Sequence, residues 1–333
     1  MSQAASSFLS TVRAWLSGMV PSEPINRVRN VKAEGEDESG MARVVAGVTG
    51  RRPGRAVKRQ GRRRSGLRAK RLDLASALGL IEGMAHAPDS LPTVVIGAGL
   101  SGLLLARALQ ARSTGVVVLE KSRGFGGRLA TKRVGEVVFD QGAQFITVRD
   151  PVFAAEVEAW RRAGWVGEWG SGAHPRLIGR PAMTAVPKGL AVGLDIRREH
   201  QVTAVRRAED GTWTLSLAAQ PPLAAARVLL TCPVPQALAL LDAGAVALPG
   251  AVRAALEQLT FHPCLALLAV LGGPSAVPGA GLALSDGPVR WLADNVKKGV
   301  AHGVPAAVTI HATPAFSVAH YAASEAEVAA QLL

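Results

Sequence analysis

Hydrophobic and polar positions follow a regular pattern from residue 93 onward, and this pattern predicts alternating strands and helices. Short apolar runs at 93–96 and 116–119 are typical of buried strands, and the apolar stretch at 103–109 between them is typical of a helix. Asp150 followed by Pro151 predicts the start of another helix, because Asp caps free amides and Pro fits the first turn. The order of strand, helix and strand predicts an α/β fold.

Later segments continue the pattern. Asp210 and Gly211 predict the turn of a hairpin over 202–217. Further strands are expected at 228–231, 264–271 and 306–312, and a helix is expected to begin at Glu325. A chain of 333 residues is long enough for two domains with substantial cores.

The N-terminal segment differs from the rest in charge and in periodicity. Residues 1–83 carry 16 Lys and Arg against 7 Asp and Glu, whereas residues 84–333 carry 22 against 18. Weak hydrophobic periodicity predicts that residues 1–90 form a disordered basic extension. Met84, just ahead of the first strand, is the expected natural start. The run 51–71 suggests a nucleic-acid-binding arm, but it has no aromatic residue for base stacking, which argues against nucleic acid as a partner.

Composition narrows the remaining function classes. Cys232 and Cys264 both lie in apolar runs, which is typical of buried free thiols in a reducing compartment and favours a cytoplasmic location. No spacing of His and Cys predicts a metal site. The apolar run at 264–271 has eight residues, far fewer than the roughly 20 that a membrane span needs. The sequence therefore predicts neither a bound metal nor a membrane span.

A glycine motif opens the first predicted helix. Gly97 allows a tight turn after the strand, Gly99 lets the backbone approach a pyrophosphate, and Gly102 lets the helix pack closely on the strand. Free amides at the start of the helix favour phosphate. Glu120 ends the second strand, where a carboxylate accepts hydrogen bonds from both ribose hydroxyls of an adenosine. This combination predicts a dinucleotide site, which NAD and FAD would both fit.

Two further segments favour a flavin dinucleotide. Gly126 and Gly127 precede Arg128, which would pair with a pyrophosphate, although a surface arginine is the alternative. Small residues at 142 and 143 would let a flavin ring lie against the backbone. Gln144 follows them, either as a flavin contact or as a buried structural amide.

These stretches together resemble a known family. GAGLSG, LEKSRGFGGR and FDQGAQFIT are similar to the opening of FAD-dependent amine-oxidase-like proteins, and the whole resembles the renalase-like oxidoreductases. Matching stretches continue at 231–238, 288–299 and 308–321. The resemblance implies an FAD-binding Rossmann-like domain with an inserted α+β substrate domain on a mixed sheet. It also implies oxidation of dihydro isomers of NAD(P)H, with hydride passing to the flavin and oxygen reoxidising it to hydrogen peroxide.

Residue roles follow from the same resemblance. The residues expected to contact FAD are Gly97, Gly99, Gly102, Glu120, Lys121, Arg128, Gln144 and, through its backbone, Val202. Asn295, Lys297 and His311 are substrate-side candidates, each with a structural or surface role as the alternative. No catalytic residue is expected apart from these, because hydride transfer to flavin needs placement more than an acid or a base.

The resemblance also suggests a division of the chain. The FAD-binding βαβ unit would span 91–150, a helical substrate-domain segment 151–200, return strands of the FAD domain 201–235, and the substrate domain 236–333. Relatives end with a strand, a Gly-Asp turn and a helix that face the flavin, and this chain is expected to lack that element. Three alternatives remain open: an amine oxidase or desaturase, an inactive truncated protein, and a nucleic-acid-associated protein.

Overall fold

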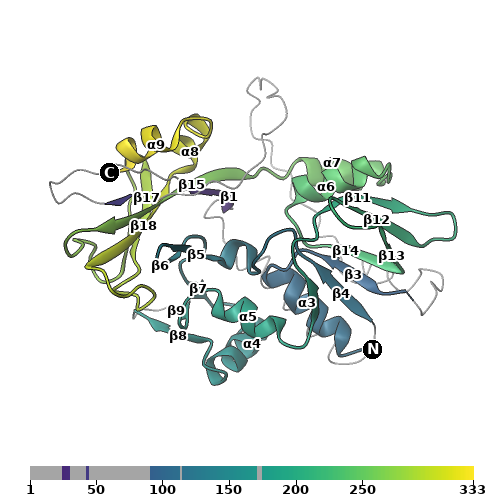
Figure 1. Cartoon of the computed structure of the whole chain (residues 1–333), viewed down its shortest axis with the longest axis horizontal. Helices are drawn as coiled ribbons and strands as arrows, with labels where there is room; N and C mark the ends of the chain where they lie inside the picture. The colour runs from purple at the N-terminus through teal and green to yellow at the C-terminus, as the bar shows by residue number, and fades with distance from the viewer. Residues whose placement is uncertain (1–24, 31–42, 45–90, 113–114, 171–174) are drawn as a thin grey trace.

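The computed structural model describes residues 91–112, 115–170 and 175–333 in full, and residues 25–30 and 43–44 as backbone. Figure 1 shows a lobe around β15, β17 and β18 at one end of the molecule and a lobe around β3, β4 and β14 at the other. Strands β7–β9 and helices α4 and α5 lie between and below them (Figure 1). Mixed α/β architecture with a Rossmann-like domain is thus confirmed.

A four-stranded parallel sheet forms the Rossmann-like part. Its order is β10 (Asp195–Arg197), β4 (Val116–Leu119), β3 (Thr93–Ile96) and β14 (Arg227–Leu230). All three neighbouring pairs run parallel. Helix α3 (Leu100–Gln110) connects β3 to β4. Strands β3, β4 and β14 lie where the sequence predicts them, because continuous apolar runs suit strands that are covered on both faces.

An antiparallel meander packs beside this sheet. It consists of β11 (Val202–Arg207), β12 (Trp213–Leu217) and β13 (Leu223–Ala225), with the predicted hairpin turn between the first two strands. Helix α6 (Val234–Ala243) covers it, and α7 (Gly250–Glu257) follows α6 (Figure 1).

The second large sheet is built mainly of antiparallel pairs. Its core runs in the order β15 (His262–Leu271), β18 (Ala306–Ala312), β17 (Val289–Asp294) and β16 (Gly281–Ala283). Helices α8 (Pro314–Ala319) and α9 (Glu325–Leu332) pack on it, with Leu265, Ile310 and Val328 in the shared core. Helix α9 begins where the sequence predicts it, and Ser324 and Glu327 form a capping box at its start.

Two short strands from the N-terminal segment join this sheet, and for the remainder of residues 1–90, which lies outside the described residues, disorder remains a prediction. Strand β1 (Ile25–Asn30) pairs in parallel with β15, and β2 (Arg43–Val44) pairs with it in the antiparallel sense. A free strand edge carries N–H and C=O groups that bind any extended segment, whatever its hydrophobic periodicity. The basic run 51–71 and Met84 lie outside the described residues, so the predictions made for them remain predictions.

Shorter strands and two helices join the lobes. Strands β5 (Thr131–Val134) and β6 (Val137–Asp140) form a hairpin, and β7 (Ile146–Thr147), β9 (Arg176–Gly179) and β8 (Val166–Trp169) form a small sheet. Helix α4 (Pro151–Arg162) begins as predicted, because the Asp150 carboxylate accepts hydrogen bonds from the amides of Val152 and Phe153.

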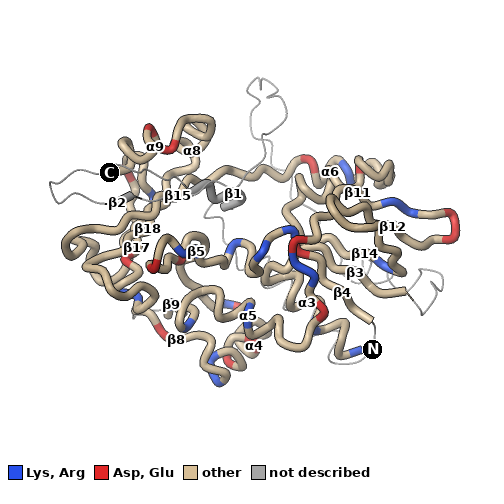
Figure 2. The backbone as a smooth tube through the Cα atoms, in the orientation of Figure 1, with Lys and Arg blue, Asp and Glu red and all other residues tan. Residues whose placement is uncertain are grey.

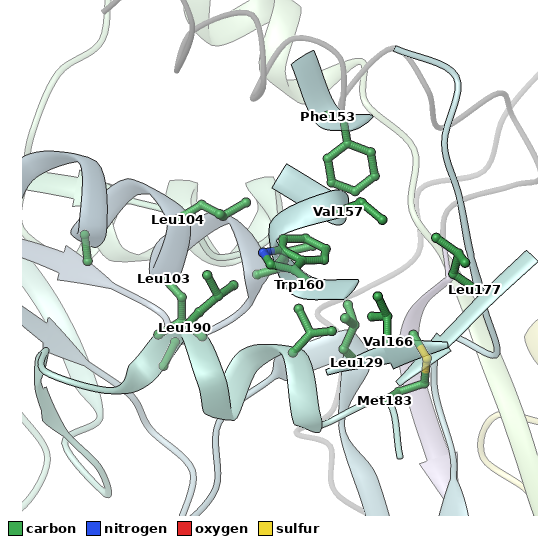
Figure 3. Packing of buried hydrophobic residues seen from close by; sticks show 14 of the residues in the cluster. Leu103, Leu104, Leu129, Phe153, Val157, Trp160, Val166, Leu177, Met183 and Leu190 are labelled. Atoms are coloured by element: carbon green, nitrogen blue, oxygen red, sulfur yellow. The ribbon is translucent and has the colours of Figure 1, made fainter. Parts of the chain in front are cut away.

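The largest apolar core lies where α3, α4 and α5 (Ala185–Ala191) meet. Trp160 is buried in the same cluster as Leu104 and Leu190, and its ring meets that of Phe153 edge to face with centroids 5.7 Å apart (Figure 3). Removing an aromatic side chain from such a core costs about 3–5 kcal/mol. This core fixes α3, and therefore the glycine loop ahead of it, against the small sheet.

Basic and acidic residues are mixed along the part of the chain that the structure describes. Figure 2 shows Lys and Arg interspersed with Asp and Glu along the described chain. Among these residues, no helix is both long and apolar enough to span a bilayer. The same residues contain no cluster of His, Cys, Asp and Glu that would hold a metal ion.

Candidate cofactor and substrate site

The predicted glycine loop has the geometry of a phosphate-binding turn. Gly97 has a φ of 109°, which only glycine adopts without strain, and its amide donates to the carbonyl of Leu119. A side chain at Gly102 would lie directly against the carbonyl oxygen of Gly97. Gly99 is the N-cap residue of α3, so no side chain covers the first amides of the helix. A Cβ built on Gly99 would meet no atom within 4 Å. The loop is therefore tightly packed at Gly102 and has open space at Gly99, as a bound pyrophosphate requires.

A second glycine pair lies against the first loop. The amide of Gly126 donates to the carbonyl of Ala98 over 2.9 Å, and Gly126 forms a bridge with Gly99. Gly126 has a φ of 113°, and a Cβ on Gly127 would be 3.5 Å from the Cα of Gly99. The structure thus brings together two glycine segments that the sequence associated with one dinucleotide site.

Arg128 follows this pair and provides the positive charge of the site. Burial lowers the pKa of its guanidinium, yet no carboxylate or carbonyl among the described residues pairs with it. Its own carbonyl accepts a hydrogen bond from Ala143, and a side chain at Gly142 would lie directly against that carbonyl. The segment that contains Gly142 therefore lies against Arg128, which directly follows the Gly126–Gly127 pair. A partly buried cation that follows the glycine pair in contact with Gly99, and that has no partner among the described residues, fits the pyrophosphate of a dinucleotide.

Glu120, the predicted ribose ligand, connects the glycine loop to the end of β4. Its Oε2 accepts from the amide of Ala98 at 2.9 Å, and its Oε1 accepts from the amide and hydroxyl of Ser122. Each carboxylate oxygen has more than one acceptor position, so hydroxyl groups of a ribose could still bind. Lys121 extends to the side chain of Gln236 over 3.3 Å, and Val202 is the buried first residue of β11.

Gln144, Asn295 and His311 are brought together around residues 140–142. The amide of Gln144 donates to the carbonyls of Asp140 and Gly142. Asn295 accepts from the amide of Asp140 and donates to β18. The Nε2–H of His311 donates to the carbonyl of Gln141 over 2.8 Å, and burial lowers the pKa of this histidine. All three side chains therefore make hydrogen bonds within the protein, which favours the structural role that was the alternative for each.

A buried ion pair completes this cluster, and the sequence did not point to it. The ammonium of Lys298 lies 2.9 Å from Oδ2 of Asp140 and 3.1 Å from both the carbonyl and the Oε1 of Gln144. Both charged side chains are fully buried. Burial lowers the pKa of Lys298, and the charge of Asp140 opposes that shift. A charge pair this deep fixes residues 140–144 to the turn after β17.

Lys297, which the sequence favoured over its neighbour, points elsewhere. Its ammonium donates to the carbonyls of Ser275 and Val277 and closes a loop away from the cluster. The only sequence signal for Lys298 was its place directly before Gly299, which has a φ of 77° and turns the chain.

Comparisons with known proteins agree with this geometry. Residues 95–155 match the family model of the NAD(P)-binding Rossmann-like domain, and residues 164–294 match that of flavin containing amine oxidoreductases. The two matched regions are thus similar to those of FAD-dependent oxidoreductases of the amine-oxidase type. FAD is the cofactor that these matches imply, and the three glycine segments, Glu120 and Arg128 fit it.

Curated relatives match over short stretches. The chain is 38% identical over 80 residues to a flavin-containing monoamine oxidase, AofH, of Mycobacterium tuberculosis, covering 24% of this chain and 18% of that protein. It is 44% identical over 54 residues to a lysine-specific histone demethylase 1 of Drosophila melanogaster, covering 16% of this chain and 6% of that one. The matches thus span less than a fifth of either relative.

Solved structures share the fold across most of the chain. A putrescine oxidase bound to putrescine has a TM-score of 0.52 at 14% identity, covering 73% of this chain and 80% of its own. A protoporphyrinogen oxidase from Exiguobacterium has a TM-score of 0.52 at 16% identity, covering 67% and 76%. At these identities the likeness concerns the fold alone.

Proposed function

We propose that this protein is an FAD-dependent oxidoreductase that takes a hydride from a small reduced substrate. The observation that carries the proposal is the contact of the Gly126–Gly127 pair with the start of α3 and of Gly142 with Arg128, whose guanidinium has no partner among the described residues. When bound, FAD supplies the hydride acceptor. The glycine segments and Arg128 would hold its phosphates, Glu120 would hold its ribose, and the 140–145 segment would hold its ring.

The favoured substrates are dihydro isomers of NAD(P)H, as the resemblance to renalase-like proteins implies. In the overall reaction such an isomer loses a hydride and becomes aromatic NAD(P)⁺. Oxygen receives that hydride and one proton and becomes hydrogen peroxide. Loss of a hydride from a dihydropyridine requires no base, and the polar side chains of Gln144, Asn295 and His311 are all occupied by protein partners.

A second candidate is oxidation of an amine to an imine, with oxygen again reduced to hydrogen peroxide. The match of residues 164–294 to the amine oxidoreductase family model favours it. A putrescine oxidase shares the fold. Both candidates use the same cofactor site and differ only in the substrate.

The test is a visible absorption spectrum of the purified chain after reconstitution with FAD, followed by anaerobic addition of substrate. We expect bound flavin bands that bleach with an NADH preparation rich in the isomers and persist with pure NADH. Bleaching by putrescine alone would favour the amine candidate. A chain that retains no flavin through gel filtration would refute the proposal.

A variant pair tests the cofactor site. Glu120→Gln should weaken FAD binding roughly 10- to 100-fold, because a hydrogen bond to a charged group is worth about 1.5–3 kcal/mol. Glu136→Gln is the matched control, since that carboxylate is almost fully exposed. Equal FAD affinity in both variants would contradict the role of Glu120.

A further inference from the structure

Three aromatic rings meet directly after the segment that holds Gln144. Phe145 follows that residue, Trp169 ends β8, and Trp291 lies in β17. Ring centroids are 5.8 Å apart for Phe145 and Trp169, 5.5 Å for Phe145 and Trp291, and 6.1 Å for the two tryptophans. A side chain at Gly281 would come within 2.7 Å of both tryptophans, so glycine there leaves room for them. We call these three rings the aromatic box.

Arg176, from β9, places its guanidinium against the aromatic box. The guanidinium carbon lies 4.7 Å from the ring centre of Phe145, 5.4 Å from that of Trp291 and 5.8 Å from that of Trp169. These contacts hold the cation in place. Among the described residues, however, no acceptor binds its N–H groups and no carboxylate neutralises it.

A second donor in the box is also unsatisfied. The indole Nε1 of Trp291 is buried and has no hydrogen-bond partner in the described structure. A buried donor without an acceptor costs about 1–3 kcal/mol. A second cation close to the box, the ammonium of Lys298 at 5.5 Å from the ring of Trp169, is already paired with Asp140. With respect to the described residues, the box therefore has two kinds of N–H donor without an acceptor and one uncompensated positive charge.

We propose that the aromatic box and Arg176 form a substrate subsite for the phosphate-bearing part of a reduced nicotinamide nucleotide. An anionic phosphate oxygen would accept hydrogen bonds from Arg176 and Trp291 and would neutralise the cation. A protonated amine does not fit, because Arg176 already occupies the electron-rich ring faces and repels a second cation. This inference rests on the proposed function and selects between its two candidate substrates.

The experiment compares two ligands that differ only in a phosphate. Isothermal titration calorimetry of the FAD-loaded protein, without oxygen, would use reduced nicotinamide mononucleotide and reduced nicotinamide riboside, with putrescine as the cationic probe. We expect the mononucleotide to bind roughly 10- to 100-fold more tightly than the riboside, from one charge-assisted interaction. Putrescine should show no measurable binding. Equal affinity for the two nicotinamide ligands, or tighter binding of putrescine, would overturn the proposal.

Variants locate the effect. Arg176→Gln should abolish the preference for the phosphate-bearing ligand, Arg176→Lys should retain part of it, and Trp291→Phe should weaken it a few-fold while keeping the ring. The matched control is Arg207→Gln, because Arg207 also stacks on a tryptophan, Trp213. The indole N–H of Trp213 is likewise buried and has no partner in the described structure. That pair belongs to the β11–β12 hairpin, at the opposite end of the molecule from β17 (Figure 1).

The outcomes separate this inference from the proposed function. An unchanged preference in Arg176→Gln, with FAD still bound and far-ultraviolet circular dichroism intact, would refute the subsite. A preference that depends on Arg176, in a protein whose flavin no isomer bleaches, would support the subsite and refute the proposed reaction. Tryptophan emission should be quenched by the mononucleotide in the wild type and not in Arg176→Gln, which gives a readout independent of turnover.

Discussion

Replacement of Lys298 by Met tests how strongly the buried ion pair holds the site together. The change removes the ammonium and leaves the Asp140 carboxylate fully buried, with one oxygen still accepting from the amide of Met183 at 2.9 Å. It also removes the donor from the carbonyl and Oε1 of Gln144. Removing one partner of a buried pair costs about 3–5 kcal/mol, because the remaining charge is uncompensated. We expect a loss of stability of that size.

The double variant Asp140→Asn, Lys298→Met should recover most of the loss. The asparagine side chain introduced at position 140 keeps an oxygen for the amide of Met183, and neither buried site then carries a charge. Lys297→Met is the control for loss of a lysine at this turn, because its partners are two loop carbonyls. That control should lose about 1 kcal/mol, the usual worth of a hydrogen bond.

Urea unfolding followed by tryptophan fluorescence and by circular dichroism is the assay. Because a chain with two large sheets need not unfold in one step, the transition that both probes share is the one to compare. A difference in stability of less than about 1 kcal/mol between Lys298→Met and the Lys297→Met control would refute the reasoning, because an uncompensated buried charge costs more than that. A double variant no more stable than the single one would show that the uncompensated charge is not the cause.

The pH dependence provides an independent check. Burial lowers the pKa of Lys298 from 10.5, so in the window just below 10.5 the unfolded chain binds more protons than the folded chain. The free energy of unfolding contributed by this group therefore rises with pH through that window and is smaller below it. The Lys298→Met variant should lack this contribution. If the free energy of unfolding changes equally with pH in Lys298→Met and in the wild type, the contribution assigned to Lys298 is wrong.

Three further predictions concern the glycine loop, His311 and Cys264. Gly102→Ala should destabilise the protein by roughly 1–3 kcal/mol or more, because the added Cβ would overlap the carbonyl of Gly97. Gly99→Ala should fold normally and lose FAD affinity. Thermal denaturation and FAD titration distinguish these two effects. Burial lowers the pKa of His311, so its contribution to stability should be lost as pH falls below 6.5, where only the unfolded chain takes up a proton; urea midpoints for the wild type and His311→Asn across that range check this. Burial raises the pKa of Cys264 to about 12, so iodoacetamide at neutral pH should modify it only after urea is added, and peptide mass spectrometry would reveal earlier labelling.

The βαβ unit could be predicted because every signal for it is local. The apolar runs, the spacing of the glycines and the acid at the end of the second strand all fall between residues 93 and 120. Each of these residue types is required by the local backbone of the same segment, as the positive φ of Gly97 and the close packing at Gly102 show. Strands β3 and β4 and helix α3 therefore follow from the pattern alone.

The ion pair and the aromatic box could not be predicted in this way. Lys297 and Lys298 are identical neighbours, and one binds loop carbonyls while the other is fully buried against Asp140, 158 positions away. Only the tertiary path of the chain decides which lysine turns inward. Trp169 and Trp291 come from different sheets, and their patterns predict only that each is partly buried. The pairing of β1 with β15 depends likewise on an edge that exists only in the folded sheet.

The ion pair and the box are mechanically connected, because Gln144 and Phe145 are consecutive residues. Lys298 and Asn295 anchor residues 140–144 to the turn after β17, and Phe145 provides the ring that Arg176 approaches most closely. Hydride transfer depends on placing the two reacting atoms within a fraction of an ångström. A variant that loosens the anchor should therefore shift the box as well. Lys298→Met should weaken the preference for the phosphate-bearing nucleotide even though Lys298 touches no proposed ligand, and a fully retained preference would show that the box is positioned by its own strands.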